Sequence, residues 1–262
     1  MRSSLRHGHV NWALADQILV SGVNFAIGIL LARYLGLAEF GRYSLIWLVV
    51  LFAQSIQQAF VTTPMVTLGP KTEDAERRRA YYGAVLMLQI LFAAASGVSV
   101  WLVLRLGTGW QAGWRLDGLE LPLAAVIVTR QLQEFVRRQF YADTAGRAVF
   151  VNDCVAYGAL LVIIPGLAYA DALRLDIVFE AIAVSAGTAA ILGLIAAGLP
   201  AAGGGGLVKV IRRHWRFARW LVATALLQWF GANYFFLAAC ALDHGQSSGC
   251  WHSLAFTGFI ST

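Results

Sequence analysis

The most informative residues in this chain are ionisable side chains that lie inside long apolar segments. Within residues 119–141, Arg130, Glu134, Arg137 and Tyr141 recur at intervals of three or four residues, which places them on one face of a helix. A charge at the centre of a membrane costs about 2.5–3.5 kcal/mol on insertion scales, so this net-positive stripe cannot face lipid. We expect either a wet cationic cavity, or a protein interior in which Arg130 pairs with Glu134 while Arg137 reaches the headgroups.

The first two apolar segments carry a second set of polar residues. Asp16 and Asn24 share nearly the same face, and Asp16 lies about one turn inside its segment. Asp16 is a proton- or cation-coupling carboxylate, a partner for an arginine of the stripe, or a hydrated residue near the headgroups, the last being slightly favoured. Gln54, Gln57 and Gln58 form an amide ridge that suits hydroxyl-rich ligands or, as we favour, helix packing.

The remaining polar residues give no sign of catalysis. We expect Asn152 and Asp153 near the start of one segment, and Glu180 near the outer end of the next, to lie at the membrane interface. All five histidines fall in predicted loops or tails, and the three cysteines lack metal-ligand spacing. H-E-x-x-H and Walker A sequences are absent from the sequence. We therefore predict no catalytic residue, no metal site, no cofactor and no enzymatic activity.

Composition predicts the elements that position these residues. The 262 residues are 59% hydrophobic and 13% charged, whereas a soluble domain carries about 25% charged residues. Seven apolar runs are each long enough to cross about 30 Å of hydrocarbon as a helix. They are residues 12–34, 43–63, 81–105, 119–141, 148–170, 177–199 and 218–242. The predicted fold is an all-α membrane protein of about seven transmembrane helices, comprising one six-helix lobe and the first helix of a second.

The distribution of charge predicts the orientation. With the N-terminus in the cytoplasm, the inner segments hold 14 Lys and Arg and the outer ones hold 5. The net charge of +6 is therefore a topology signal, and because it is scattered over four loops we expect no nucleic-acid partner. Arg77–Arg79 or Lys209–Arg219 would bind anionic lipid headgroups in a generic way.

Four regions are expected along the chain. Residues 1–200 form the lobe, 201–217 a basic, glycine-rich cytoplasmic linker, 218–242 the seventh helix and 243–262 a tail of different character. Gly-Val-Asn-Phe in the first segment matches Gly-Ala-Asn-Tyr in the seventh, as a duplicated unit would. The tail is either a natural outer tail or the product of an interrupted or frame-shifted reading frame.

Two stretches resemble bacterial polysaccharide-export flippases of the multidrug/oligosaccharidyl-lipid/polysaccharide exporter superfamily. Leu31–Tyr43 contains Ala-Arg-x-Leu-Gly, a two-residue gap and Glu-Phe-Gly-x-Tyr, which is similar to the family's first outer loop. Gln133–Arg138, followed by Arg147 and Asn152-Asp153, is similar to the junction of its fourth and fifth helices. With the topology, the resemblance covers about residues 10–240.

The resemblance implies a flippase in the bacterial cytoplasmic (inner) membrane. By alternating access it would move an undecaprenyl-pyrophosphate-linked oligosaccharide, such as an O-antigen, exopolysaccharide or capsule repeat. Its partners would be that lipid, membrane lipids and other polysaccharide-assembly membrane proteins. The implied site residues are Arg130 and Arg137 for the phosphates, Gln54, Gln58 and Asn24 for the substrate, and Asp16 and Glu134 for coupling.

Family members have twelve to fourteen helices, so the seven helices predicted here indicate a truncated transporter that is incomplete for transport. Three other functions stay open. A drug or cation exporter of the same superfamily predicts an acid-dominated cavity. A membrane-embedded polysaccharide polymerase or ligase needs a sizeable outer loop, and the longest outer connection here has about 14 residues. A non-transporting scaffold, or the remnant of a broken gene, is the third.

Overall fold

The computed structural model describes residues 2–71, 74–106, 116, 118–198 and 206–242, and the side chains of residues 12–232 within those ranges. In this part every element is helical, as expected, and the tail 243–262 lies outside it. The elements are α1 (Arg2–Leu35), α2 (Leu37–Gln57), the π-helical turn η1 (Gln58–Thr62), α3 (Thr63–Leu68), α4 (Ala75–Leu106), α5 (Glu120–Ala142), α6 (Gly146–Tyr169), α7 (Leu175–Ala197) and α8 (Leu207–Leu242).

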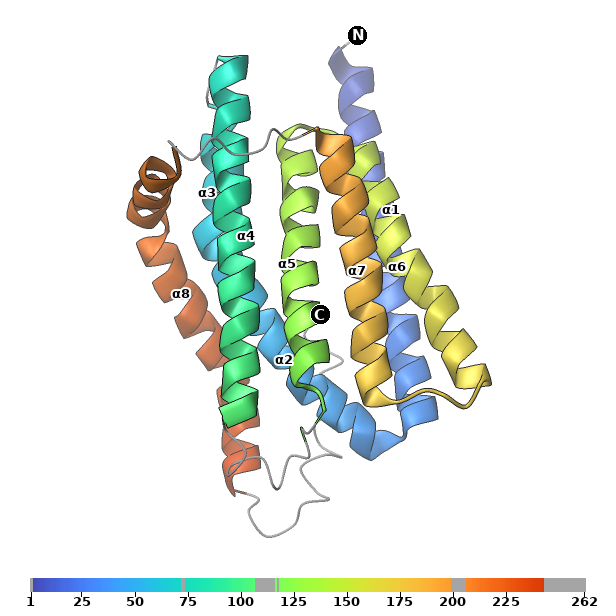
Figure 1. Ribbon diagram of the computed structural model, residues 1–262. Coiled ribbons are helices and arrows are strands. Elements are labelled where there is room, and N and C mark those ends of the chain that lie inside the picture. The colour runs from blue at the N-terminus through green and yellow to red at the C-terminus, as the bar shows by residue number, and fades with distance from the viewer. Residues whose placement is uncertain (1, 72–73, 107–115, 117, 199–205, 243–262) are drawn as a thin grey trace.

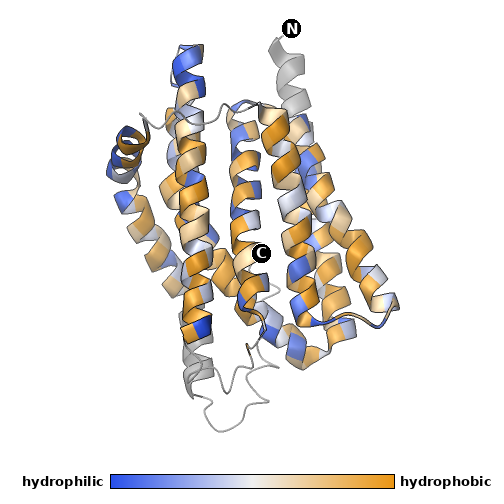
Figure 2. Ribbon diagram, viewed as in Figure 1, coloured by the Kyte–Doolittle hydropathy of each residue, from blue (hydrophilic) through white to orange (hydrophobic). Residues whose placement is uncertain are grey.

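In the described part of the chain, five helical segments are long and apolar enough to cross a membrane. They are Trp12–Leu35, Leu37–Leu68, Ala75–Leu106, Gly146–Tyr169 and Leu175–Ala197. The structure is consistent with a helical membrane protein, and α5 and α8 are the two expected spans that are not among the five. In Figure 2, α4 is hydrophobic over most of its length, whereas hydrophilic residues recur along α5. The charges of α5 must therefore be covered by other helices.

Helix α5 lies at the centre of the bundle and contributes residues to both of its apolar cores. It packs between α4 and α7, and α6 packs in turn on α7 and α1 (Figure 1). Val126 and Ile127 of α5 are fully buried in one core, and Phe135 and Val136 are fully buried in the other. Because apolar residues of α5 are buried in both cores, the rotation of α5 about its axis is fixed. Its polar stripe therefore faces α6 and α1.

A single residue makes the turn between α1 and α2. Gly36 has a φ of 81°, where a Cβ would be unfavourable. Near the start of α2, Arg42 Nη1 donates hydrogen bonds of 2.7 Å to both carboxylate oxygens of Glu39. In the Leu31–Tyr43 motif, the Gly thus permits the backbone conformation of the turn, and the Glu forms a local ion pair with Arg42.

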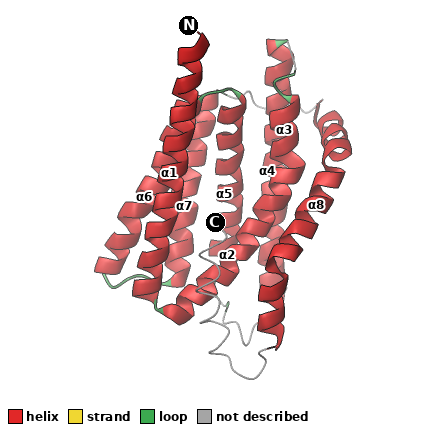
Figure 3. Cartoon of the chain, turned by 180° about the vertical axis from the view of Figure 1, so that it is seen from behind, coloured by secondary structure: helices red, strands yellow, loops and turns green. Residues whose placement is uncertain are grey.

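Helix α8 begins earlier than expected, at Leu207, so most of the linker predicted for 201–217 is helical. The bundle holds this helix because Val210, His214 and Ala218, spaced four residues apart, are all buried. Figures 1 and 3 show the first turns of α8 lying at an angle to the rest of the helix.

His214 fastens α8 to the bundle, which corrects its expected position in a loop. Its Nδ1 lies 3.2 Å from the carbonyl oxygen of Phe60, and its Nε2 lies 2.8 Å from the hydroxyl of Tyr81. Because a carbonyl only accepts, Nδ1 carries the proton and Tyr81 donates to Nε2. Burial lowers the pKa of His214 to about 4, so the ring is neutral at pH 7.

Candidate functional site

Arg137 of α5 is the centre of a buried ionic cluster built from three helices. Its Nη2 lies 2.8 Å from Asp16 Oδ2 of α1, and its Nε lies 2.7 Å from Asp153 Oδ2 of α6. Its Nη1 lies 3.5 Å from Glu134 Oε2, one turn earlier in α5. Tyr141 donates a 2.7 Å hydrogen bond to Asp16. One guanidinium thus ties α1, α5 and α6 together at the end of the bundle where α1 begins.

The cluster corrects three expectations. Asp16 is 1% exposed and pairs with an arginine of α5, which is the alternative that we did not favour. Asp153 is fully buried, and its neighbour Asn152 donates a 2.7 Å hydrogen bond to the carbonyl of Ala189 in α7, so neither is interfacial. Arg137 is only 17% exposed and is held by carboxylates, so it does not reach the headgroups.

Arg130 lies two turns before Arg137 in α5, about 10 Å away along the helix axis. Its environment is different. Its Nη1 donates a 2.7 Å hydrogen bond to Gln133 Oε1, and its Nη2 donates one of 3.1 Å to the hydroxyl of Tyr157. The guanidinium also lies over the Tyr157 ring, 5.4 Å from its centroid. In the described part of the chain no carboxylate lies within ion-pair distance of Arg130, so the expected pair with Glu134 does not form.

The charges of the site are polarised along α5. Around Arg137, three carboxylates face two arginines, because Glu134 also pairs with Arg138. Counted as formal charges, that end carries an excess of one negative charge, and Arg130 supplies one positive charge deeper in the bundle. The site as a whole is therefore neutral, although α5 alone is positive. Among the described residues, no group of three or more His, Cys, Asp or Glu side chains is arranged to hold a metal ion.

Gln57 is the packing residue of the predicted amide ridge. It is fully buried, and its Nε2 donates hydrogen bonds of 3.0 Å to Gln89 Oε1 of α4 and 2.7 Å to the carbonyl of Gln131 of α5. Gln54 is partly buried on the same helix. Packing, the favoured interpretation of the ridge, is confirmed for Gln57.

Asn24 and Gln58 lie in two separate grooves, neither of which is lined by a residue of the ionic cluster. Asn24 lines a groove of about 320 Å³ between α1 and α2, together with Gln17 and Ser21. Gln58 lines one of about 480 Å³ between α2 and α8, together with Gln228. Both grooves offer neutral amides and hydroxyls beside apolar walls, which suits a ligand with hydroxyl groups.

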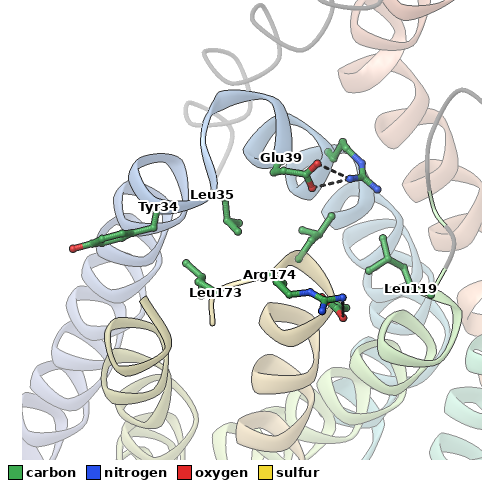
Figure 4. A pocket seen from close by; sticks show the side chains of 10 residues that line it. Tyr34, Leu35, Glu39, Leu119, Leu173 and Arg174 are labelled. Carbon is green, nitrogen blue, oxygen red and sulfur yellow. Dashed lines mark hydrogen bonds and ion pairs between the residues drawn. The ribbon is translucent and has the colours of Figure 1, made fainter. Parts of the chain in front are cut away.

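A third cavity, of about 530 Å³, opens at the opposite end of α5 from the cluster. Its walls come from the α1–α2 turn and from the starts of α5 and α7 (Figure 4). The arginines that line it are paired, Arg42 with Glu39 and Arg174 with Asp176 at 3.0 Å. Since each cation has a local counter-charge, this cavity offers little net charge to an ionic ligand.

Sequence reasoning identified five members of the site and missed two. The expected members, which the structure brings to the same region, are Asp16, Arg130, Glu134, Arg137 and Tyr141. Asp153 and Tyr157 were not expected. A signal for both existed, because they lie four residues apart in an apolar helix and so share a face that matches the α5 stripe.

Comparison of the chain with protein-family models, with curated proteins and with solved structures gives no match.

Proposed function

We propose that this protein is part of a flippase for an undecaprenyl-pyrophosphate-linked oligosaccharide, acting by alternating access across the bacterial inner membrane with its N-terminus in the cytoplasm. Three features support the proposal. The first is the Leu31–Tyr43 motif, the second is the charge bias of the loops, and the third is the arginine stripe on α5.

The observation that carries the proposal is that the hydrogen-bond partners of Arg130 are neutral. It lies inside the bundle, is held by the neutral partners Gln133 and Tyr157, and has no carboxylate within ion-pair distance in the described region. A guanidinium oriented by neutral groups keeps its charge available for an anion. Arginine also matches the geometry of phosphate oxygens. We assign Arg130 to the pyrophosphate, whereas Arg137 would bind a phosphate only after releasing a carboxylate.

The cluster around Arg137 suits coupling better than substrate binding. Its excess negative charge favours uptake of a proton or a cation. Oδ1 of Asp16 and Oδ2 of Asp153 are both buried and make no hydrogen bond among the described residues, so each is an atom that can accept a proton. Protonation of Asp16 would weaken the bond to Arg137 that ties α1 to α5. We therefore retain Asp16 and Glu134 as coupling residues and add Asp153.

The grooves that contain Asn24 and Gln58 are proposed to contact the sugars. The alternative of a drug or cation exporter is less favoured, because a cationic substrate needs a carboxylate without a partner. Asp16, Glu134 and Asp153 each have an arginine instead.

Binding of defined polyprenyl lipids to the purified chain in nanodiscs tests the assignment of Arg130. We expect affinity to fall from undecaprenyl pyrophosphate to undecaprenyl phosphate to undecaprenol. Arg130→Gln should weaken pyrophosphate binding about 10- to 100-fold, the range for a hydrogen bond to a charged group, and Arg130→Lys should lie between.

The matched control is Arg105→Gln, which removes an exposed arginine at the end of α4 and should leave binding unchanged. If Arg130→Gln binds undecaprenyl pyrophosphate as tightly as the wild type, the assignment is wrong. If the wild type does not distinguish the pyrophosphate from undecaprenol, the proposed substrate is wrong.

A further inference from the structure

The first turns of α8 present three distinct surfaces around the helix. One is the face of Val210, His214 and Ala218, which is buried against the bundle. The second is apolar and exposed, consisting of Val208, Ile211 and Trp215, spaced three and four residues apart, with 67%, 37% and 56% exposure. The third is basic and exposed, consisting of Lys209, Arg212, Arg213, Arg216 and Arg219.

The contacts of α8 place this segment near the boundary of the hydrocarbon. The 32 residues of α4 span about 48 Å, which exceeds the roughly 30 Å of a hydrocarbon core, so its ends project beyond the core. Tyr81 lies about 9 Å from the start of α4, and it bonds His214 and faces Arg213, whose guanidinium lies 5.8 Å from the ring centroid. The first turns of α8 therefore lie at the depth where headgroups meet acyl chains.

The basic surface has no internal counter-charge. Residues 207–219 contain no Asp or Glu. Among the described residues, none of the five cations lies within ion-pair distance of a carboxylate. A row of unneutralised cations beside an exposed apolar row is the pattern of a helix that lies in the membrane surface.

We propose that residues 207–219 form an interfacial helix that binds the phosphate headgroups of anionic phospholipids. Val208, Ile211 and Trp215 contact the acyl chains, while the guanidinium groups of Arg212 and Arg216 bind the phosphate oxygens. The bundle holds the helix in place through His214, so the surface is already formed before lipid binds. The site is separate from Arg130 and does not depend on the proposed flippase activity.

Fluorescence quenching in vesicles tests this site in the full chain. The protein is reconstituted into phosphatidylcholine with an increasing fraction of brominated phosphatidylglycerol, and quenching at Trp215 is obtained by difference from Trp215→Phe. We expect phosphatidylglycerol to be preferred over phosphatidylcholine at this position. Each cation contributes about fivefold at a charged surface, so the double variant Arg212→Gln/Arg216→Gln should lose about 25-fold of the preference.

The matched control is Arg33→Gln/Arg105→Gln, which removes two exposed arginines at the other end of the bundle and should keep the preference. An unchanged preference in the Arg212/Arg216 variant would overturn the proposal. So would the loss of quenching when millimolar inorganic pyrophosphate is added, since that would identify a site for a soluble phosphate anion. Circular dichroism of every variant verifies that the helices remain folded.

Discussion

Replacing Arg137 with methionine should be among the most damaging single changes in this protein. Methionine keeps much of the side-chain volume but removes the charge that faces Asp16, Asp153 and Glu134. Asp16 and Asp153 are 1% and 0% exposed, so water cannot replace the guanidinium. Removing one partner of a buried ion pair costs about 3–5 kcal/mol, and Arg137→Met should lower the free energy of unfolding by that amount.

Two further variants separate charge from packing. Arg138→Met removes an arginine that is 37% exposed and pairs within α5, and it should cost at most about 1 kcal/mol. The triple variant Asp16→Asn/Arg137→Met/Asp153→Asn removes the unpaired carboxylates along with the cation. It should recover most of the loss, because neutral replacements of buried charge networks are often tolerated.

The free energy of unfolding is measured by titrating the purified chain from mild-detergent micelles into SDS and following helical circular dichroism. If Arg137→Met and Arg138→Met cost the same, the cluster does not stabilise the bundle. If the triple variant is no more stable than Arg137→Met, the loss came from packing and not from unpaired carboxylates.

Changes at three other residues should alter the stability of the protein by measurable amounts. Because the folded chain keeps His214 at a pKa of about 4 while the unfolded chain has about 6.5, only the unfolded chain gains a proton as the pH falls between these values. The contribution of His214 to the free energy of unfolding should therefore fall by about 1.4 kcal/mol per pH unit as the pH falls through that window, and it should be constant above the window. In pH-dependent unfolding curves, His214→Gln should remove this contribution. Gln57→Leu should cost about 1–3 kcal/mol in the SDS titration, because it leaves the buried Oε1 of Gln89 unpaired and removes the hydrogen bond to the carbonyl of Gln131. Gly193→Ala should cost about 1–3 kcal/mol in the same titration, because its Cβ would overlap Val136, whereas Gly158→Ala meets nothing within 4 Å and should be neutral.

Helix periodicity explains why part of the site was predictable. Arg130, Glu134 and Arg137 lie on one helix, so their spacing alone places them on one face. Asp16 and Asp153 lie on α1 and α6, and their distance to Arg137 depends on how those helices pack. Their burial was therefore misjudged from their positions near the ends of apolar runs.

The sequence by itself determined that this protein is helical and built for a membrane, because apolar length and scarcity of charge are local properties that a lipid solvent demands of each segment. It also determined that α5 carries a stripe that must avoid lipid. The tertiary structure alone decided what that stripe meets: carboxylates from α1 and α6 neutralise Arg137 and leave Arg130 with neutral partners. It likewise decided that residues 207–217 are a docked helix, because the burial of His214 between Phe60 and Tyr81 is a contact between distant segments that no local pattern records.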